Sequence, residues 1–334
     1  DFKGSSPRLM VKEGDKVLAG SPVLADKQNP DILLTSPVSG NVAEIVRGEK
    51  RKLLAVLITA EGDEAVDFGA KDPKVLNAGD VKENLLKSGL WPSIIQRPYG
   101  VIANPGLTPK AVFVSAFSTA PLAAASEFVF KDDIQAIQAG VTAMSKVAPV
   151  HVCVNSETSL FAGLKDATLH TVTAKRHPAG NVGVQISHIS PIKKGETVWT
   201  LSLLSLAAIG KLFLGGKLDL CRKVAVTGPA ALKTGYVIAL PGTPMSALEG
   251  CFDPSVETRF ISGDALSGEN VGKDGCLGFF DNQVTLIKEG RDREFLGWAN
   301  PFRFNQFSSS MAYFSWMLPK KKYNMDTNTH GGVR

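Results

Sequence analysis

Short runs rich in apolar residues follow one another through the N-terminal part of the chain. Three such runs span residues 8–26, 31–46 and 52–60. Turn-forming residues interrupt them, namely Gly14–Asp15, Gly20, Pro22 and Gly40. These runs are read as short strands, and glycine and proline provide the turns between them. The pattern predicts a small all-β module over residues 1–68, a barrel-sandwich hybrid of the biotinyl/lipoyl type.

A different rhythm follows, in which helical and strand-like segments alternate. Helical spacing of apolar residues covers Val81–Gly89 and residues 132–147, with Asp132 as the expected N-cap of the second helix. Buried strands are expected at residues 110–117, 149–155 and 169–174. Because helices separate the strands, a mostly parallel sheet is favoured. We therefore expect a Rossmann-like α/β domain over residues 80–222.

The most hydrophobic stretch of the chain is Thr197–Gly216. Lys211 interrupts it, and apolar runs of roughly 10 to 14 residues are more often buried helices than membrane spans. Gly215–Gly216 would then provide a left-handed C-cap. We expect a core helix here, and we expect membrane contact only through partner proteins.

The pattern changes again after residue 222. Two strands and a short helix within residues 222–250 precede strands within residues 258–268 and 282–292. This order predicts a small β-grasp domain of the SLBB type over residues 223–298. Residues 299–334 are expected to begin a truncated C-terminal region, because the sequence starts without methionine and stops within a polar stretch.

Composition and charge mainly exclude certain classes of protein. The 334 residues are 44% apolar and 21% charged, as in globular proteins, and the net charge of +5 is not gathered into a nucleic-acid-binding stripe. No basic segment followed by an apolar core is visible, so we expect no signal peptide and a cytoplasmic protein. The cysteines (Cys153, Cys221, Cys251 and Cys276) form no C-x-x-C pair. We therefore expect no metal site and buried, reduced thiols.

Lys27 lies in a segment, residues 22–46, that is similar to the hairpin carrying biotin or lipoate on a lysine. In such carriers the lysine occupies the tip of a tight turn, about eight residues before a P-x-x-G bend. Here Pro37 follows Lys27 by 10 positions, and Pro30 widens the turn. We expect Lys27 to be unmodified; a biotin or lipoyl carrier is the alternative.

Nucleotide-binding loops have recognisable motifs, and this chain lacks them. No G-x-G-x-x-G occurs, and "GKLFLGGKL" from Gly210 is one residue too long for a P-loop and has leucine where Ser or Thr should bind magnesium. Among five histidines, His177 is the best ligand candidate because it lies in a Pro/Gly loop after a predicted strand. The candidate ligand loop comprises His177, Pro178, Gly180 and Gly183. No catalytic residue is expected.

Aromatic residues are concentrated between Phe295 and Trp316, which contain eight of the 25 in the chain without a helical period. Two explanations remain open. The rings pack against a further C-terminal region, or they form an interface with a membrane-bound partner, helped by the basic run Lys320–Lys322. The expected interface residues are Phe295, Trp298, Phe302 and Phe304.

The order of the expected domains and several motifs resemble one family. The motifs are "DKQNPDILLTSPVSGNV", "RGEKRKLLAVLI", "SGLWPSIIQRPYG", "HPAGNVGVQISHISP", "VAVTGPA", "ISGDALSG" and "EGRDREFLGWA". They are similar to those of NqrA, a component of bacterial Na+-translocating NADH:quinone oxidoreductases. More distantly, the domains resemble RnfC and the FMN-binding subunit of complex I.

This resemblance implies a peripheral subunit on the cytoplasmic side of the bacterial inner membrane, docked on NqrB beside the other Nqr subunits (B–F), with quinone as a further contact. The complex would use FAD, FMN, riboflavin and iron–sulfur cofactors, with NADH and ubiquinone as substrates. The FMN-binding relatives use an R-G-G-A-G-F-P loop, whereas Lys87–Gly100 carries large side chains at that place. We therefore expect no cofactor in this chain and no catalysis by the isolated chain. A flavin-binding subunit of an NADH dehydrogenase, of the RnfC type, is the alternative.

Overall fold

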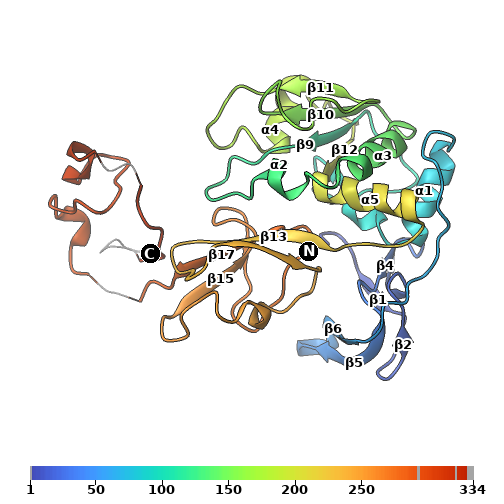
Figure 1. The fold of residues 1–334 in the computed structure, drawn as a ribbon, viewed down its shortest axis with the longest axis horizontal. Coiled ribbons are helices and arrows are strands. Elements are labelled where there is room, and N and C mark those ends of the chain that lie inside the picture. The colour runs from blue at the N-terminus through green and yellow to red at the C-terminus, as the bar shows by residue number, and fades with distance from the viewer. Residues whose placement is uncertain (1, 292–293, 320–321, 329–334) are drawn as a thin grey trace. The chain divides into compact units, whose positions relative to one another are not determined.

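The computed structural model describes residues 2–291, 294–319 and 322–328. The chain forms two compact units, which Figure 1 shows as ribbons. Unit 1 comprises Asp1–Ala120 and Ala124–Arg222, and unit 2 comprises Pro121–Ala123 and Lys223–Arg334.

The N-terminal part of unit 1 consists of two small antiparallel sheets. One contains β1 (Pro7–Leu9), β3 (Pro22–Asp26) and β4 (Leu33–Thr35), and the other contains β2 (Lys16–Val17), β5 (Gly40–Arg47) and β6 (Leu53–Ala60). A short 3-10 turn, η1 (Glu49–Arg51), joins β5 to β6. Gly40 lies so close to β6 that a Cβ atom there would overlap the carbonyl oxygen of Thr59. Glycine is therefore required at the start of β5.

The rest of unit 1 is built around a six-stranded mixed sheet of order β11-β10-β9-β12-β7-β8. Its strands are β7 (Ile95–Arg97), β8 (Val101–Ile102), β9 (Val112–Ser115), β10 (Val150–Val154), β11 (Thr168–Thr171) and β12 (Val198–Ser202). The four strands β9 to β12 are parallel, whereas β7 and β8 are antiparallel additions at one edge. The sequence-based expectation of a mostly parallel α/β sheet is thus confirmed.

Helices cover both faces of this sheet. They are α1 (Ala78–Lys87), α2 (Ser126–Val129), α3 (Ile134–Ser145), α4 (Val182–Ile189) and α5 (Leu203–Gly215), and a 3-10 turn, η2 (Trp91–Ser93), follows α1. The main core contains Val112 and Val114 of β9 together with α3 and α5, which lie side by side. Phe113, between those two valines, faces the opposite side and packs with Ile186 of α4. Alternate residues of one strand therefore serve two cores.

The apolar stretch Thr197–Gly216 is only partly the helix that its composition predicts. Its first part, Val198–Ser202, is strand β12, buried between β9 and β7, and the helix begins at Leu203. A short buried strand and a buried helix share a continuous apolar pattern, so composition alone does not separate them. The predicted C-cap is confirmed, since Gly216 has φ +71°.

Two smaller sequence-based predictions are wrong. Asp133, and not Asp132, precedes α3, and its side chain does not cap the helix but pairs with Lys211 at 3.3 Å. All four thiols are free, as expected, but Cys221 and Cys276 are exposed, so the expectation of buried cysteines holds only for part of the set.

Unit 2 contains a five-stranded mixed sheet of order β14-β13-β17-β15-β16. Its strands are β13 (Arg222–Thr227), β14 (Gly235–Ala239), β15 (Thr258–Ser262), β16 (Glu269–Asn270) and β17 (Gln283–Lys288), and η3 (Met245–Leu248) is its 3-10 turn. Phe252 and Phe260 meet edge to face in its core, with ring centroids 4.9 Å apart. Among the described residues after β17, only the short turns η4 (Gly297–Ala299) and η5 (Phe314–Met317) interrupt the irregular chain.

Candidate functional site

The parallel sheet of unit 1 reverses its strand order at β9. The chain proceeds from β9 to β10 on one side and later returns to β12 on the other. Ser115 ends β9 and lies in register with Ser202, which ends β12. Ligands of open α/β sheets bind outside the carboxyl ends of the strands at such a reversal. We call Ser115, Thr119, Gly180, Gln185 and Ser202 the switch-point site.

Hydrogen bonds join the loop after β9 to the loop before α4 at this site. The Ser115 hydroxyl lies 2.9 Å from the carbonyl oxygen of Gly180, to which it can donate, and it accepts from Gln185 Nε2 at 2.9 Å. The N–H of Gly180 donates to Thr119 Oγ1 at 2.9 Å. A Cβ atom on Gly180 would lie 2.6 Å from the nitrogen of Thr119, so only glycine allows the two loops to approach this closely.

Gln185 leaves one polar atom unused. Its side chain is 3% exposed, and among the described residues Oε1 has no hydrogen-bond partner. A buried carbonyl oxygen of this kind can accept a hydrogen bond from a hydroxyl or amide donor. The Ser202 hydroxyl is less available to a ligand, because it caps α5 by accepting a hydrogen bond from the N–H of Ser205 at 3.0 Å. The site therefore provides hydrogen-bonding groups, and none of its five residues carries a carboxylate.

Only some residues of the predicted ligand loop lie at the switch-point site. Gly180 is part of the switch-point site, and His177 lies at its rim, with Nδ1 3.5 Å from Thr119 Oγ1. Pro178 follows a cis peptide bond and is exposed. Gly183 is exposed within α4, and no atom lies within 4 Å of the position that a Cβ atom would take there. Ligand contact by these residues stays a prediction.

Sequence reasoning missed a pair of histidines on the same sheet. Nδ1 of His151 on β10 lies 2.8 Å from Nε2 of His170 on β11, so one ring must donate and the other accept. The His151 ring also stacks on Phe113, with centroids 4.7 Å apart. Burial lowers the pKa of both imidazoles, and the charge of His170 lowers the pKa of His151 further. The pair is 19 residues apart in sequence, and no motif marks it.

Unit 1 is expected to become less stable as the pH falls below 6.5, the usual histidine pKa. Since both folded-state pKa values are lowered, the unfolded chain binds more protons below that pH, and the free energy of unfolding decreases until the folded values are passed. A His151→Gln/His170→Gln variant should lose most of this dependence. Melting temperatures at about pH 8 and about pH 5.5 measure it. The exposed His188→Gln variant should retain the wild-type dependence, and a double variant that also retains it would contradict the assignment.

Lys87–Gly100 is the stretch that was expected from the resemblance to correspond to the R-G-G-A-G-F-P loop. Trp91 and Ile94 are fully buried here, and the Trp91 indole N–H donates to the carbonyl oxygen of Ala103 at 2.7 Å. Backbone N–H groups of the stretch are used within it, for example that of Ile94, which donates to the carbonyl oxygen of Trp91 at 3.0 Å. These residues do not fit a phosphate cradle, which needs open backbone donors.

Lys27 follows a buried carboxylate instead of standing at a free hairpin tip. Asp26 accepts hydrogen bonds from the N–H groups of Gln28 and Asn29 at 2.8 and 3.0 Å. The N–H of Lys27 donates to the carbonyl oxygen of Ser6 at 2.9 Å, while its side chain is exposed. The turn is thus fixed to the N-terminal segment. That Lys27 is unmodified stays a prediction.

The aromatic interface residues predicted in unit 2 are exposed. The exposed fractions are 93% for Phe295, 55% for Trp298, 67% for Phe302 and 39% for Phe304. Phe302 packs edge to face against Phe314, with centroids 5.6 Å apart. Of the predicted basic run Lys320–Lys322, Lys320 and Lys321 lie outside the described residues.

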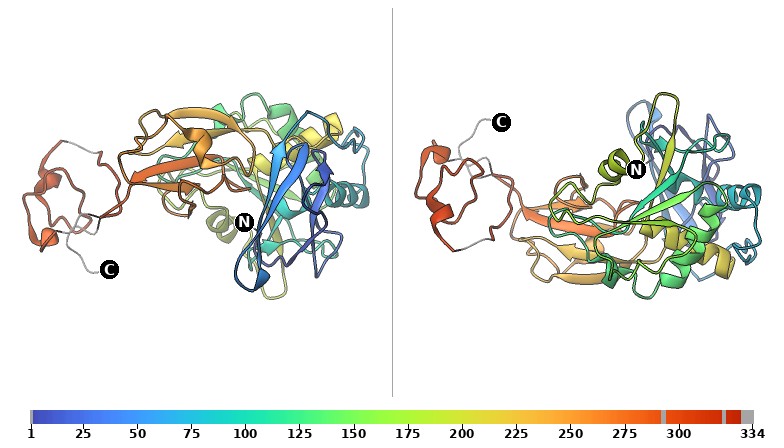
Figure 2. Two further views of the ribbon diagram at one scale, coloured as in Figure 1. Left: turned by 90° about the horizontal axis from the view of Figure 1, so that it is seen from below. Right: turned by 90° about the horizontal axis from the view of Figure 1, so that it is seen from above.

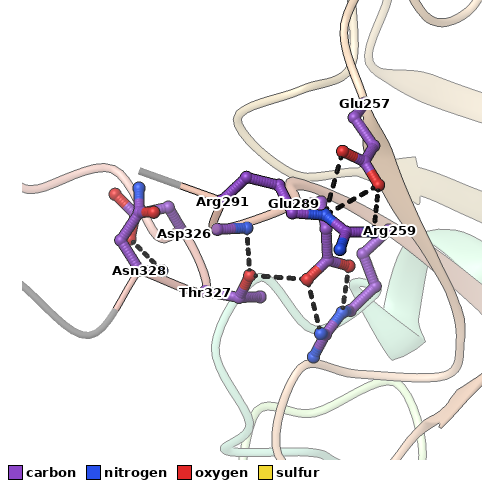
Figure 3. A network of polar contacts seen from close by, with 8 residues as sticks. Glu257, Arg259, Glu289, Arg291, Asp326, Thr327 and Asn328 are labelled. Atoms are coloured by element: carbon purple, nitrogen blue, oxygen red, sulfur yellow. Dashed lines mark hydrogen bonds and ion pairs between the residues drawn. The ribbon is translucent and has the colours of Figure 1, made fainter. Parts of the chain in front are cut away.

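A polar network fastens the chain on both sides of this aromatic segment (Figure 3). Arg259 binds Glu289 through Nε at 2.8 Å and Nη2 at 2.7 Å, and this pairing lowers the pKa of Glu289. Thr327 donates to Glu289 at 3.0 Å and accepts from the N–H of Gly290. Arg291 pairs with Glu257 at 2.6 Å. The described residues 294–319, which we call the aromatic loop, therefore lie between two stretches of chain that this network holds.

Metal-binding clusters and membrane-spanning helices are absent from the described part of the chain. No group of three or more His, Cys, Asp or Glu residues within it could hold a metal ion. No helix within the described ranges is long and apolar enough to cross a membrane.

Comparison with known proteins identifies two domains by family. Residues 1–61 match the NqrA N-terminal barrel-sandwich hybrid domain, and residues 76–218 match the NqrA second alpha/beta domain. The first match confirms the barrel-sandwich hybrid, and the second confirms an α/β domain. A chain of an NAD+-reducing [NiFe]-hydrogenase is similar at 12% identity with a TM-score of 0.34, covering 55% of this chain and 41% of that one, which is too distant to support an argument.

Curated relatives match along the whole chain. The protein of Yersinia pestis bv. Antiqua is 34% identical over 340 residues, that of Alcanivorax borkumensis 36% over 341, and that of Haemophilus influenzae 35% over 346. Each match covers 100% of this chain and 76% of the relative. All three carry the name of the A component of a Na(+)-translocating NADH-quinone reductase. The resemblance seen in the motifs is confirmed, and the chain belongs to the NqrA family.

Proposed function

We propose that this chain is an accessory and assembly component of a Na+-translocating NADH:quinone reductase, and that it docks on NqrB and supports quinone reduction coupled to Na+ export. The observation that carries this proposal is the match to NqrA proteins over 100% of the chain. On this proposal the protein lies on the cytoplasmic side of the bacterial inner membrane and reaches the membrane only through partners.

The chain holds no redox cofactor on this proposal, and the flavins and iron–sulfur centre of the complex belong to the other Nqr subunits. One feature supports this division: the stretch Lys87–Gly100 has backbone donors engaged within it. Electron transfer needs a cofactor, so the electrons would pass through neighbouring subunits.

The domain boundaries expected from sequence remain part of this proposal. They are residues 1–68 for the barrel-sandwich hybrid, 80–222 for a Rossmann-like domain, 223–298 for an SLBB-like β-grasp domain and 299–334 for the start of a further region. The reversal of strand order at β9 supports the Rossmann-like assignment. The five-stranded mixed sheet of unit 2 supports the β-grasp assignment.

Docking would use the aromatic loop of unit 2. Its rings are exposed, and its two ends are fixed at Glu289 and Thr327, so less conformational entropy is lost when a partner binds. Large exposed aromatic side chains are also the groups that contribute most to interfaces.

The double variant Trp298→Ala/Phe302→Ala tests the docking. Because both side chains are more than half exposed, we expect a folded protein whose amount in the purified complex falls about tenfold or more. Quantitative co-purification with a tagged NqrB measures this. Tyr99→Ala removes another exposed ring, 77% accessible and outside the loop, and should co-purify normally. Normal co-purification of the double variant would refute the docking surface.

A further inference from the structure

We propose that the outer edge of β6 is a docking edge for a second copy of this chain, which pairs with it as an antiparallel strand. The proposal concerns a surface remote from the aromatic loop in sequence and does not rest on the proposed function. In its sheet the strand order is β2-β5-β6, and no described strand pairs with the outer side of β6. Figure 1 and Figure 2 show β5 and β6 running side by side as a ribbon.

β6 lacks the charged residues and prolines that usually prevent an edge strand from pairing with another chain. Its sequence is LLAVLITA, eight residues with no charged residue and no proline. Leu54 and Leu57 are 59% and 43% exposed. Proteins normally guard such edges, because unpaired N–H and C=O groups are a template for another strand. The register against β5 shifts at Leu54 and again between Leu57 and Ile58, and the pairing from Ala55 to Leu57 is regular. An apolar edge without a charged residue or a proline therefore marks an interaction surface.

Opposite charges flank the two ends of this edge. The tip of the β5–β6 hairpin carries four exposed cations, Arg47, Lys50, Arg51 and Lys52, beside Glu49. The other end of β6 is followed by three exposed carboxylates, Glu61, Asp63 and Glu64. In an antiparallel pair related by a two-fold axis, the tip of each copy meets the base of the other. The edge is thus complementary in charge to itself, which favours a second copy over other partners.

One register brings the two charged ends together. With the two-fold axis at Leu57, opposite residues of β6 have numbers that sum to 114, so Leu54 faces Ala60, and the turn η1 comes beside residues 61–64 of the other copy. Within one chain, Glu64 is only weakly engaged. It pairs with Lys16 at 3.5 Å with both side chains 69% exposed, which contributes little.

The backbone at the tip supports a role for its cations. Lys50 and Arg51 have φ values of +54° and +61°. Turns of this kind favour Asn and Gly, because a side chain in the left-handed region is disfavoured. Two long cationic side chains are held there in spite of this cost, and strain of this kind is typical of functional positions.

Sedimentation equilibrium of the full chain tests the proposal. We expect a weak dimer, because one strand pair buries less area than a standard interface. Reversing the tip (Lys50→Glu/Arg51→Glu) or the base (Asp63→Lys/Glu64→Lys) should each raise the dissociation constant about tenfold or more. Leu57→Lys, which places like charges at the axis, should abolish the dimer. The exposed pair Lys193→Glu/Lys194→Glu is the matched control and should dimerise like wild type.

Mixing the two reversed variants gives the most specific result. At one end of the mixed dimer, the acidic tip of the tip variant meets the cationic residues 63 and 64 of the base variant. At the other end, the native cationic tip meets the native carboxylates. A heterodimer with near wild-type affinity should therefore form. A wild-type chain that stays monomeric up to its solubility limit overturns the proposal, and so does a mixture that fails to restore association. Binding of the wild-type tip to anionic vesicles or to another Nqr protein, by a monomeric chain, would also overturn it in favour of that partner.

Discussion

Gly210→Ala is expected to lower the free energy of unfolding of unit 1 by about 3 kcal/mol, a large effect for the addition of one methyl group. A Cβ atom on Gly210 of α5 would overlap the carbonyl oxygen of Ala136 and lie 2.9 Å from its Cα atom in α3. The neighbouring atoms are backbone atoms, which cannot turn aside as a flexible side chain can. The two helices would have to separate, which would disturb their packing on the sheet.

The contact is reciprocal, which sharpens the test. A Cβ atom on Gly140 of α3 would overlap the carbonyl oxygen of Leu206 in α5, so Gly140→Ala should cost a similar amount. The double variant should cost less than the sum, because one separation of the helices relieves both overlaps. Urea unfolding followed by circular dichroism measures all three free energies.

The exposed Gly215 provides the matched control in the same helix. No atom lies within 4 Å of the position of its added Cβ, so Gly215→Ala should leave stability unchanged or raise it by up to about 1 kcal/mol through helix propensity. If Gly210→Ala were as stable as Gly215→Ala, the close approach of α3 and α5 would be incorrect.

Local patterns predicted most of the elements because local physics decides them. The apolar run in residues 52–60 corresponds to β6, and Gly216 ends α5 in a left-handed conformation as its position predicted. The prediction of one helix over Thr197–Gly216 failed because a buried strand and a buried helix have the same apolar composition. Val198–Ser202 is apolar because it is buried in a sheet, and the adjoining α5 is apolar because it is buried against that sheet.

The candidate site was less predictable, since tertiary contacts assemble it. Gly180 was identified from its Pro/Gly loop, but its partners Ser115 and Thr119 are 65 and 61 residues away. Ser115 carried one usable signal, because it lies near the end of a predicted strand, where α/β proteins place ligand groups. Gln185 carried none. Its significance lies in an unpaired buried oxygen, which only the packing of α4 on the sheet produces.

Asp26→Asn is expected to destabilise the N-terminal sheets by about 3 kcal/mol at neutral pH. The carboxylate is 5% exposed and accepts four hydrogen bonds, from the hydroxyl of Ser5 at 2.7 Å and from the N–H groups of Ser6, Gln28 and Asn29 at 2.8 to 3.0 Å. An amide nitrogen cannot accept hydrogen bonds. The substitution would therefore leave buried donors unpaired and would release both the turn at Lys27 and the N-terminal segment.

The pH dependence of stability distinguishes the effect of the Asp26 charge from a disturbance of packing by the substitution. Burial raises the pKa of the Asp26 carboxyl, but the hydrogen bonds from Ser5, Ser6, Asn29 and Gln28 outweigh it, so its pKa lies below the usual 3.8. The carboxylate then contributes stability that is fully present above the unfolded-state pKa of 3.8 and is lost as the pH falls through the lower folded value. The difference in unfolding free energy between wild type and Asp26→Asn should thus be constant near neutral pH and should shrink below 3.8.

The exposed carboxylate of Asp15 is the control, because it accepts a turn hydrogen bond from the N–H of Lys12 at 2.7 Å. Asp15→Asn should cost less than about 1 kcal/mol. Urea unfolding at several pH values compares both variants with wild type. An Asp26→Asn protein as stable as Asp15→Asn would mean that the turn at Lys27 is held by its backbone pairing and not by the buried carboxylate. Lys27 would then stand in a turn that needs no anchor, as the hairpin of a carrier domain does.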